Sequence, residues 1–370
     1  MIYLDYAAHT PASESVLASF CEANREYIAN PNSVHYLGRV AYERMQQASN
    51  EIARLLNVKP EEIIYTSGAS EANNLAVKGI ARSSRELGKH IISIGLEHSA
   101  VSACLTYLNN LGYEIDLVDI TTEGRVDLDH LKELIREDTI LVSVGYVDSE
   151  LGVVQPIREI ANLVKKYPNC VFHTDATQAV GKIDVDFTDV DLISFAPHKF
   201  FGLNGCGILI KKEGVVMEPQ IHGGNSTSLY RSGTPVLPMA VATETALRDA
   251  YVSMQERYDY VSELKEELLS FFKEIKEVRM NSTKYSIPYV VNVSVPGRKS
   301  LELQMEMEKR GFCISTKSAC SVPNTPSRAV FAVSRDRKTA LSSIRISLSH
   351  LTTKEELEQF KKAFLHMIQQ

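Results

Sequence analysis

Between about residues 60 and 212, short runs rich in Ile, Val, Leu and Phe alternate with segments whose apolar residues recur every three or four positions. The runs predict β-strands, and the spaced segments predict amphipathic helices around 70–87, 99–110, 127–137 and 156–167. The strand-like runs are IIYT at 63, HIISIG at 90, EIDLVDI at 114, TILVSVGYV at 139, CVFHTDA at 170, VDLISFA at 190 and CGILI at 206. This alternation is typical of a doubly wound parallel sheet in a large α/β domain.

The pattern changes at 222–238, where HGGNSTSLYRSGTPVLP is rich in Gly, Ser, Thr and Pro and predicts a loop. One long charged helix is expected from about 241 to 276, then strand-like IPYVVNVSV, a helix around LELQMEMEKR, strand-like SSIRISL and a final helix from Thr353. The first 40 residues are expected to be irregular. We predict a large domain, 16–240, and a small α/β domain, 241–370. An N-terminal segment, 1–15, is expected to pack with the small domain.

Composition narrows the class of function. The 370 residues are 44% hydrophobic and 23% charged, with a net charge of -6, which favours small-molecule chemistry over binding to nucleic acid or to anionic membranes. The N-terminus MIYLDYAAHT lacks the basic and apolar regions of a signal peptide, and no apolar run is long enough for a membrane span, so we expect a cytoplasmic protein. The six cysteines are scattered, and neither disulfides nor a metal site are expected.

The stretch SFAPHKFFG, residues 194–202, places His198 and Lys199 directly after an apolar run and next to two phenylalanines. Burial among aromatic side chains disfavours the charged form of a lysine, and a neutral amine attacks carbonyl groups. The alternative is a strand that ends in solvated basic residues. The stretch therefore raises the hypothesis that Lys199 is a Schiff-base lysine.

Two other motifs fit the same chemistry. In TSGASEANN, 66–74, small residues between a predicted strand and a predicted helix let backbone N–H groups approach an anion such as a phosphate. In FHTDATQAVG, 172–181, Asp175 ends a strand and Gln178 follows about one turn later, where ligands of parallel sheets bind. Simple helix caps are the alternative for both motifs. Together with the lysine, they meet the requirements of pyridoxal 5'-phosphate.

At this point the chain resembles the cysteine desulfurases of the class V aminotransferase family, which have fold type I. The resemblance covers nearly the whole chain and follows the family's order: YLDYAAHTP at 3, NPNSVHYLGR at 30, TSGASEANNLAVKG at 66, EHSAV at 97, ELGVVQPI at 150, DATQAVGKI at 175, PHKFFG at 197, RSGT at 231, STKSACS at 315 and SSIRISL at 342. It implies a mostly parallel seven-stranded sheet in the large domain, a smaller C-terminal α/β domain, pyridoxal 5'-phosphate as cofactor and a homodimer.

The resemblance also implies roles for individual residues toward the cofactor. Lys199 is the implied Schiff-base lysine, and Asp175 is the implied partner of the ring nitrogen. His98 is expected to stack on the ring and to take part in proton transfer. The other implied cofactor contacts are Gln178 at the phenolic oxygen, Ala69, Ser70 and His198 at the phosphate, Ser149 near the cofactor oxygen, and Thr234 from the other subunit.

The sulfur chemistry rests on Cys320 in STKSACSVPNTPSR, whose small residues and prolines predict a loop. A nucleophilic thiol must be accessible and partly ionised, and nearby Lys317 favours the thiolate. A packed apolar cysteine is the alternative, but the match to the family's cysteine loop makes Cys320 the implied nucleophile. Cys313 lies in strand-like GFCIS and is expected to be structural.

Arg345 alternates with the apolar residues of SSIRISL. Its guanidinium can hold a carboxylate by two parallel hydrogen bonds, whereas a surface ion pair is the alternative. The resemblance implies that Arg345 binds the α-carboxylate of the substrate. It also implies that Asn32 and His35 of NPNSVHYLGR line the entrance to the site.

The chain departs from the family at three motifs. Ala196 stands where the family usually has Ser, which removes one hydroxyl from the phosphate site. Ser149, beside Asp148, replaces the second Asn of the family's N-N-E. In the N-terminal motif, Tyr6 and His9 replace a common Asn and Thr. The Schiff-base lysine, the ring partner and the loop cysteine are retained.

We therefore predict a cysteine desulfurase that converts L-cysteine to L-alanine, leaves a persulfide on Cys320 and passes the sulfur to an iron–sulfur scaffold or to a tRNA or thiamine thiolation enzyme. One alternative is a selenocysteine lyase or other β-lyase of the same fold, for which Cys320 is dispensable. Another is a catalytically silent sulfur-transfer subunit, suggested by Ser149 and Ala196. Neither a membrane nor directly bound nucleic acid is expected as a partner.

Overall fold

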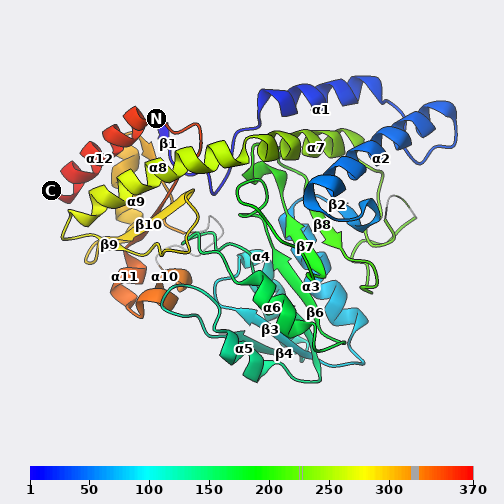
Figure 1. Ribbon diagram of the computed structural model, residues 1–370, viewed down its shortest axis with the longest axis horizontal. Helices are drawn as coiled ribbons and strands as arrows, with labels where there is room; N and C mark the ends of the chain where they lie inside the picture. The colour runs from blue at the N-terminus through cyan, green and yellow to red at the C-terminus, as the bar shows by residue number, and fades with distance from the viewer. Residues whose placement is uncertain (225, 227, 318–324, 370) are drawn as a thin grey trace.

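The computed structural model describes residues 1–224, 226, 228–317 and 325–369, and Figure 1 shows two lobes. The larger lobe contains a seven-stranded sheet in the order β2-β8-β7-β6-β5-β3-β4. Its strands are β2 (Ile63–Thr66), β3 (His90–Ile94), β4 (Glu114–Val118), β5 (Thr139–Ser143), β6 (Val171–Asp175), β7 (Leu192–Phe195) and β8 (Gly207–Lys211). Neighbours are parallel except at β8, which is antiparallel to β2 and β7. The predicted strands and the mostly parallel sheet are confirmed.

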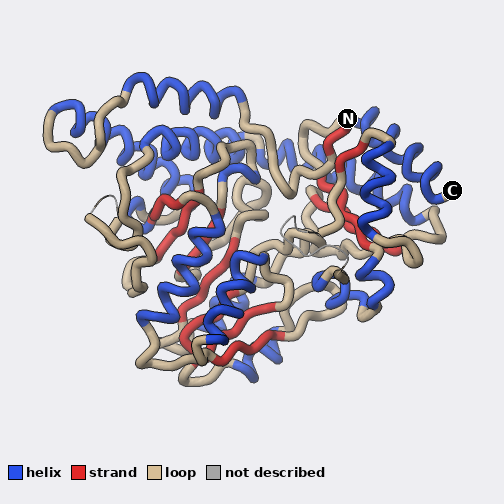
Figure 2. Tube along the Cα trace, turned by 180° about the vertical axis from the view of Figure 1, so that it is seen from behind, coloured by secondary structure: helices blue, strands red, loops and turns tan. Residues whose placement is uncertain are grey.

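Helices cover both faces of this sheet because its central strands are apolar on both sides. In β3, Ile91 packs with residues of α3 (Ala69–Ser83) and α4 (Ser99–Asn110), whereas Ile92 belongs to the cluster that contains α6 (Ile157–Val164). The two side chains diverge because successive residues of a strand point to opposite faces. With α5 (Leu128–Leu134), the four predicted helices are present, and Figure 2 shows strands flanked by helices.

One edge of the sheet brings two predicted functional motifs together. Asp175 is the last residue of β6 and pairs in register with Ser194 of β7. The short helix η2 (Pro197–Lys199) follows β7 and ends at Lys199. A second short helix, η1 (Pro60–Glu62), precedes β2. Since β6 and β7 are parallel, their carboxyl ends place the carboxylate and the lysine at the same edge.

The smaller lobe holds an antiparallel sheet and both termini (Figure 2). In this sheet β10 (Val290–Ser294) lies between β12 (Ser343–Ser347) and β9 (Arg279–Met280). A separate parallel pair joins β1 (Ile2–Tyr3) to β11 (Phe312–Cys313). The helices here are α8 (Met254–Lys273), α9 (Ser300–Lys309), α10 (Arg328–Ser334), α11 (Arg337–Leu341) and α12 (Lys354–Ile368). The predicted last helix is present, with Thr353 as the N-cap that directly precedes it.

The prediction of one helix over 241–276 is wrong. Two helices, α7 (Leu237–Val252) and α8, meet at Ser253 and run end to end from the larger lobe to the smaller one (Figure 1). Ser253 has non-helical backbone angles, and its hydroxyl donates to the Asp249 carbonyl oxygen at 2.7 Å, a contact that often bends helices. The division into 1–15, 16–240 and 241–370 stays a prediction, with its second boundary inside α7.

The prediction that the first 40 residues are irregular is also wrong. They contain α1 (Glu14–Glu26) and the first turns of α2 (Tyr36–Leu56). In α1 only Val16 and Ala23 are buried, because this helix packs on the outside of the larger lobe against α7. None of the helices in the described ranges is both long and apolar enough to cross a membrane.

Gly207 allows the turn before α3 to approach the sheet. A Cβ at position 207 would lie 2.3 Å from the carbonyl carbon of Gly68. Because this backbone would have to move, Gly207→Ala is expected to lower the free energy of unfolding by about 1–3 kcal/mol, as overpacking usually does. Urea denaturation measures the change. Gly95→Ala is the matched control, since a Cβ there has no atom within 4 Å; equal stability of the two variants would contradict the close approach.

Candidate active site

A cavity of about 410 Å³ lies at the edge of the large sheet where β6 ends. Its wall combines residues from the starts of α3 and α4, the end of β6, η2, β12 and the N-terminal segment. Nine of the predicted site residues line it: Ala69, Ser70, His98, Ser149, Asp175, Gln178, His198, Lys199 and Arg345. The structure thus gathers predicted residues from position 69 to position 345 around one cavity.

Lys199 reaches the cavity from the end of η2. Its Nζ atom donates hydrogen bonds to the carbonyl oxygens of Ala7 at 3.0 Å and of Ala8 at 2.5 Å. Both carbonyls belong to the YLDYAAHTP motif, whose contact with the lysine the sequence did not predict. The N-terminal segment therefore holds the amine at the wall of the cavity.

Asp175 is held by two donors at the end of β6. Its Oδ2 atom accepts from the Asn73 side-chain amide at 2.7 Å, and Oδ1 accepts from the Thr177 backbone N–H at 3.0 Å. Asn73 is fully buried, on the face of α3 that packs against the sheet. This contact was missed in the sequence, where the only signal is a polar residue among the apolar positions of TSGASEANNLAVKG. The two bonds fix the carboxylate that faces the cavity.

The start of α3 is open to an anion. Gly68 is the N-cap and supplies no capping side chain. The Glu71 side chain instead accepts from the Ser67 N–H at 2.7 Å and pairs with Arg231 at 2.9 Å. Ala69 and Ser70 of the first turn line the cavity at the positive end of the helix, where backbone N–H groups favour an anion.

His198 adds a neutral imidazole to this part of the wall. Burial, with smaller effects of Lys199 and His9, lowers the pKa of His198 to about 4. The His9 ring stacks on it with the ring centroids 5.5 Å apart, so one of the departures from the family motif contacts a predicted phosphate-binding residue. Because His198 is neutral near pH 7, it can offer a hydrogen bond but no positive charge.

His98 is the N-cap of α4. Its Nδ1 atom accepts from the Ala100 N–H at 3.2 Å. Burial lowers the pKa of His98; nearby Asp175 opposes this shift and Lys199 adds to it. With Nδ1 used as an acceptor, the neutral ring carries its proton on Nε2.

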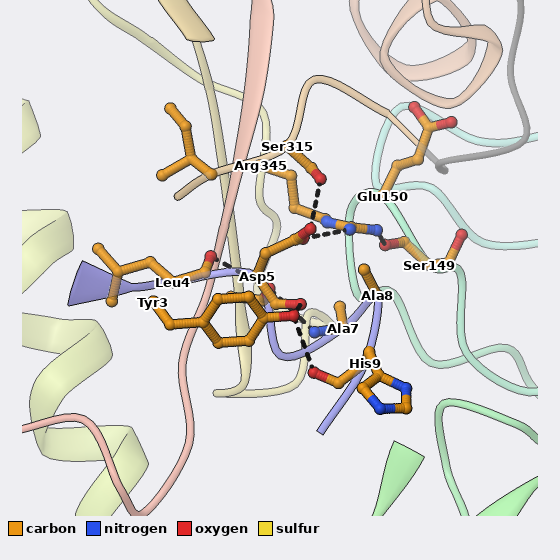
Figure 3. Close-up of polar contacts among 12 residues, drawn as sticks. Tyr3, Leu4, Asp5, Ala7, Ala8, His9, Ser149, Glu150, Ser315 and Arg345 are labelled. Atoms are coloured by element: carbon orange, nitrogen blue, oxygen red, sulfur yellow. Dashed lines mark hydrogen bonds and ion pairs between the residues drawn. The ribbon is translucent and has the colours of Figure 1, made fainter. Parts of the chain in front are cut away.

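Arg345 is buried, with 1% of its surface exposed. Figure 3 shows its guanidinium between the N-terminal segment and Ser149. Nη2 donates to Asp5 Oδ1 at 2.7 Å, and Nη1 donates to the Ser149 carbonyl oxygen at 2.9 Å. The other oxygen of Asp5 accepts from the Ser315 hydroxyl at 2.8 Å. The ion pair is therefore internal, not at the surface, and Asp5 is a site residue that the sequence did not indicate beyond its place in YLDYAAHTP.

Two further carboxyl groups line the cavity. Burial, together with Glu150, raises the pKa of Asp148 to about 7. Burial and Asp175 raise the pKa of Glu97 well above its usual value, although its Oε1 accepts from the Gly145 N–H at 2.7 Å. Both shifts favour the neutral form of the carboxyl group over the charged form, and neither shift was visible in the sequence.

Three predicted residues do not line this cavity in the described part of the chain. Asn32 is exposed and donates to the Ser226 hydroxyl at 3.1 Å, and Thr234 is exposed. His35 caps α2 by accepting from the Gly38 N–H at 3.2 Å, so its observed contact is structural.

Cys320 lies outside the described residues. Of its predicted neighbours, Lys317 is buried and donates to the Thr325 carbonyl and hydroxyl oxygens, each at 2.8 Å. Burial lowers the pKa of Lys317, and Glu150 opposes the shift. Cys313 is half-buried in β11, which fits the structural role expected for it.

The chemistry of this wall fits pyridoxal 5'-phosphate. An amine and a fixed carboxylate face the same cavity as a helix start that can take a phosphate. In addition, Thr177 Oγ1 and His198 Nδ1 are buried polar atoms of the wall without a hydrogen-bond partner in the described ranges. Buried polar atoms normally have partners, so these two are suited to a polar ligand.

The fold and the cavity define a class of pyridoxal 5'-phosphate enzymes, and comparison with known proteins identifies the family. The family model of class-V aminotransferases matches residues 2–360, and the chain belongs to this family. It is 36% identical over 361 residues to Cysteine desulfurase IscS of Dictyoglomus turgidum, and the match covers 96% of this chain and 91% of that protein. It is 38% identical over 367 residues to Cysteine desulfurase IscS of Pseudoalteromonas translucida, and that match covers 96% of this chain and 90% of the relative.

Solved structures agree with this assignment. A NifS-like protein superposes with a TM-score of 0.93 at 32% identity and covers 100% of this chain and 99% of that chain. SspA in complex with cysteine superposes with a TM-score of 0.82 at 31% identity and covers 94% and 99%. The predicted family, fold type I and the use of pyridoxal 5'-phosphate are confirmed.

Proposed function

We propose that this protein is a pyridoxal 5'-phosphate-dependent cysteine desulfurase, which converts L-cysteine and its own Cys320 thiol to L-alanine and a Cys320 persulfide. The observation that carries the proposal is the convergence of Lys199, Asp175 and Arg345 on one cavity in a chain of this family. The relatives named cysteine desulfurase and the neighbour with bound cysteine support L-cysteine as the substrate.

The cavity residues bind and orient the cofactor. When bound, pyridoxal 5'-phosphate supplies an electron sink for the substrate Cα. The residues proposed to hold it are Lys199 by a covalent link, Asp175 at the ring nitrogen, Gln178 at the phenolic oxygen, Ser149 near that oxygen, Ala69, Ser70 and His198 at the phosphate, and Thr234 of the other subunit. His98, whose neutral ring carries its proton on Nε2, is proposed to move a proton at the bound cofactor, and the Lys199 amine to exchange one with the substrate Cα.

The sulfur step takes place on the protein. The Cys320 thiolate attacks the substrate sulfur, the Cβ–S bond breaks as the S–S bond forms, and a proton completes the methyl group of alanine. No external oxidant or reductant is needed, because one thiol and L-cysteine give one persulfide and L-alanine. An acceptor thiol then removes the outer sulfur by exchange; an iron–sulfur scaffold or a thiolation enzyme is the class of acceptor proposed.

Arg345 is proposed to bind the α-carboxylate of L-cysteine. Asp5 and the Ser149 carbonyl hold its guanidinium at the cavity. Lysine keeps the charge but cannot make these bonds and a bidentate contact together. Arg345→Lys is therefore expected to raise KM for L-cysteine about 10- to 100-fold, the range for a lost hydrogen bond to a charged group. Steady-state kinetics measures the change; an unchanged KM in a variant with wild-type unfolding behaviour would contradict the role.

The proposed homodimer and compartment have separate support. Exposed apolar side chains occur close in sequence to Asn32 and Thr234, namely Val34, Tyr36 and Leu229, and a second subunit would cover such residues. In such a dimer Thr234 is proposed to reach the cavity of the other subunit. The five described cysteines are all free, as expected in the reducing cytoplasm.

Single-turnover mass spectrometry tests the function. The purified holoenzyme, with its thiols reduced beforehand, is mixed with L-cysteine, quenched and digested, and alanine is quantified in the same sample. The desulfurase predicts one added sulfur on the Cys320 peptide for each alanine formed. Alanine without modification of Cys320 would favour the β-lyase alternative, and neither product with cofactor bound would favour the silent subunit.

A further inference from the structure

Lys182 is a buried lysine that the reaction proposed above does not use. It is 7% exposed and lies in DATQAVGKI, four positions after Gln178. Its Nζ atom donates to Gln178 Oε1 at 2.7 Å. Across the described residues it forms no ion pair with a carboxylate, although buried lysines usually have one. Burying an amine without a carboxylate partner costs free energy of folding, and the side-chain oxygen of Gln178 is the partner that the structure shows.

The contacts of Gln178 fix how its amide is turned. Its Nε2 donates to the Ala7 carbonyl oxygen at 2.9 Å, and a carbonyl can only accept. Its Oε1 accepts from Lys182. One N–H of Nε2 therefore remains, and Gln178 lines the large cavity. The side chain can offer that cavity a donor, which suits an anionic oxygen of a ligand.

The geometry points to Lys182 as a positioning residue for the cofactor: by binding Oε1 it keeps the second N–H of Gln178 directed at the cofactor's phenolic oxygen and strengthens it as a donor. A cation on the acceptor end of an amide polarises the N–H at the other end, so the two hydrogen bonds reinforce each other. The inference rests on the proposed contact between Gln178 and the cofactor.

The surroundings of Lys182 show that its charge is sensitive to pH. Burial, with Lys199 and Arg345, lowers the pKa of Lys182 to about 7, so its charge is present below this pH and lost above it. Lys182 also lines a cavity of about 20 Å³, which has room for one water molecule. The other titratable or charged groups facing this region are Tyr6, His198, Arg257, Tyr289 and His350.

The test compares Lys182→Met with wild type as holoenzymes. The readouts are the pH midpoint of the absorbance change of the bound cofactor and the dissociation constant of pyridoxal 5'-phosphate. Without Lys182, Gln178 is expected to be a poorer donor to the phenolic oxygen of the cofactor. The midpoint of Lys182→Met should therefore rise by about 0.5–1 pH unit, and its dissociation constant for the cofactor should rise about 5- to 10-fold.

Lys265→Met is the matched control. Lys265 is also 7% exposed and donates to the carbonyl oxygens of Ser286 and Ile287 at 2.7 and 3.1 Å, in the smaller lobe. The Lys265→Met variant removes a buried lysine that is remote from the cofactor, so the pH midpoint of its cofactor absorbance should equal that of wild type. Lys182→Gln keeps an N–H donor without the charge and should recover about half of the shift.

The outcomes separate this inference from the proposed function. A wild-type midpoint in both Lys182→Met and Lys182→Gln would overturn the positioning role. If Lys182→Met does not bind the cofactor, Lys182→Gln is compared in its place. If Lys182→Gln loses both cofactor binding and folding, Lys182 serves the stability of the fold, and the positioning role is overturned. A shifted midpoint in an enzyme that does not desulfurate L-cysteine would refute the proposed function and leave the inference standing.

Discussion

Replacing Cys320 by serine is expected to lower the rate of sulfur transfer from L-cysteine by more than about 1,000-fold, as the loss of a nucleophile does in other enzymes. The physical reason is that a serine hydroxyl is hardly ionised at neutral pH, whereas a thiol with a usual pKa of about 8.5 already provides some thiolate. The measurements are persulfide on the protein, sulfide released with a reductant, and alanine, all after addition of L-cysteine. All three should fall together.

Cys21→Ser is the control, because Cys21 is an exposed free thiol on α1. It should retain wild-type rates and still acquire one sulfur on the Cys320 peptide. Continued release of alanine and sulfide by Cys320→Ser would contradict the persulfide route. It would instead support a lyase that does not need the thiol.

Lys199→Ala is expected to lower turnover by about 10²- to 10⁴-fold, the usual contribution of a positioned acid or base. The change removes the amine that links the cofactor and that exchanges a proton with the substrate. It also removes the hydrogen bonds to the Ala7 and Ala8 carbonyls, which hold the N-terminal segment at the cavity. Turnover and the mass of the protein after borohydride reduction are measured together; the variant should gain no cofactor mass.

Lys212→Ala provides the comparison for this variant. Lys212 pairs with Glu62 at 3.2 Å and does not line the cavity, so the variant should keep the wild-type rate and the reducible cofactor. Wild-type turnover in Lys199→Ala would show that another amine serves the reaction. A reducible cofactor in that variant would likewise place the covalent link elsewhere.

The sequence predicted the large sheet well because its central strands are buried on both faces and read as continuous apolar runs. The same reasoning failed where burial is slight or where a local bend decides the structure. Helix α1 has only two buried residues, and the helix over 241–276 is interrupted by the backbone at Ser253. These features depend on packing and on individual backbone angles, which average periodicity does not show.

For the site, the sequence by itself determined the lysine, the strand-end carboxylate and the helix start, because each lies in a local motif and parallel strands bring their carboxyl ends to one edge. The tertiary structure alone decided the partners of these groups. Asp5 meets Arg345 across 340 positions, and Asn73 meets Asp175 across 102. Contacts over such separations arise only when the lobes and the N-terminal segment pack together, and the same packing buries the groups whose pKa values shift.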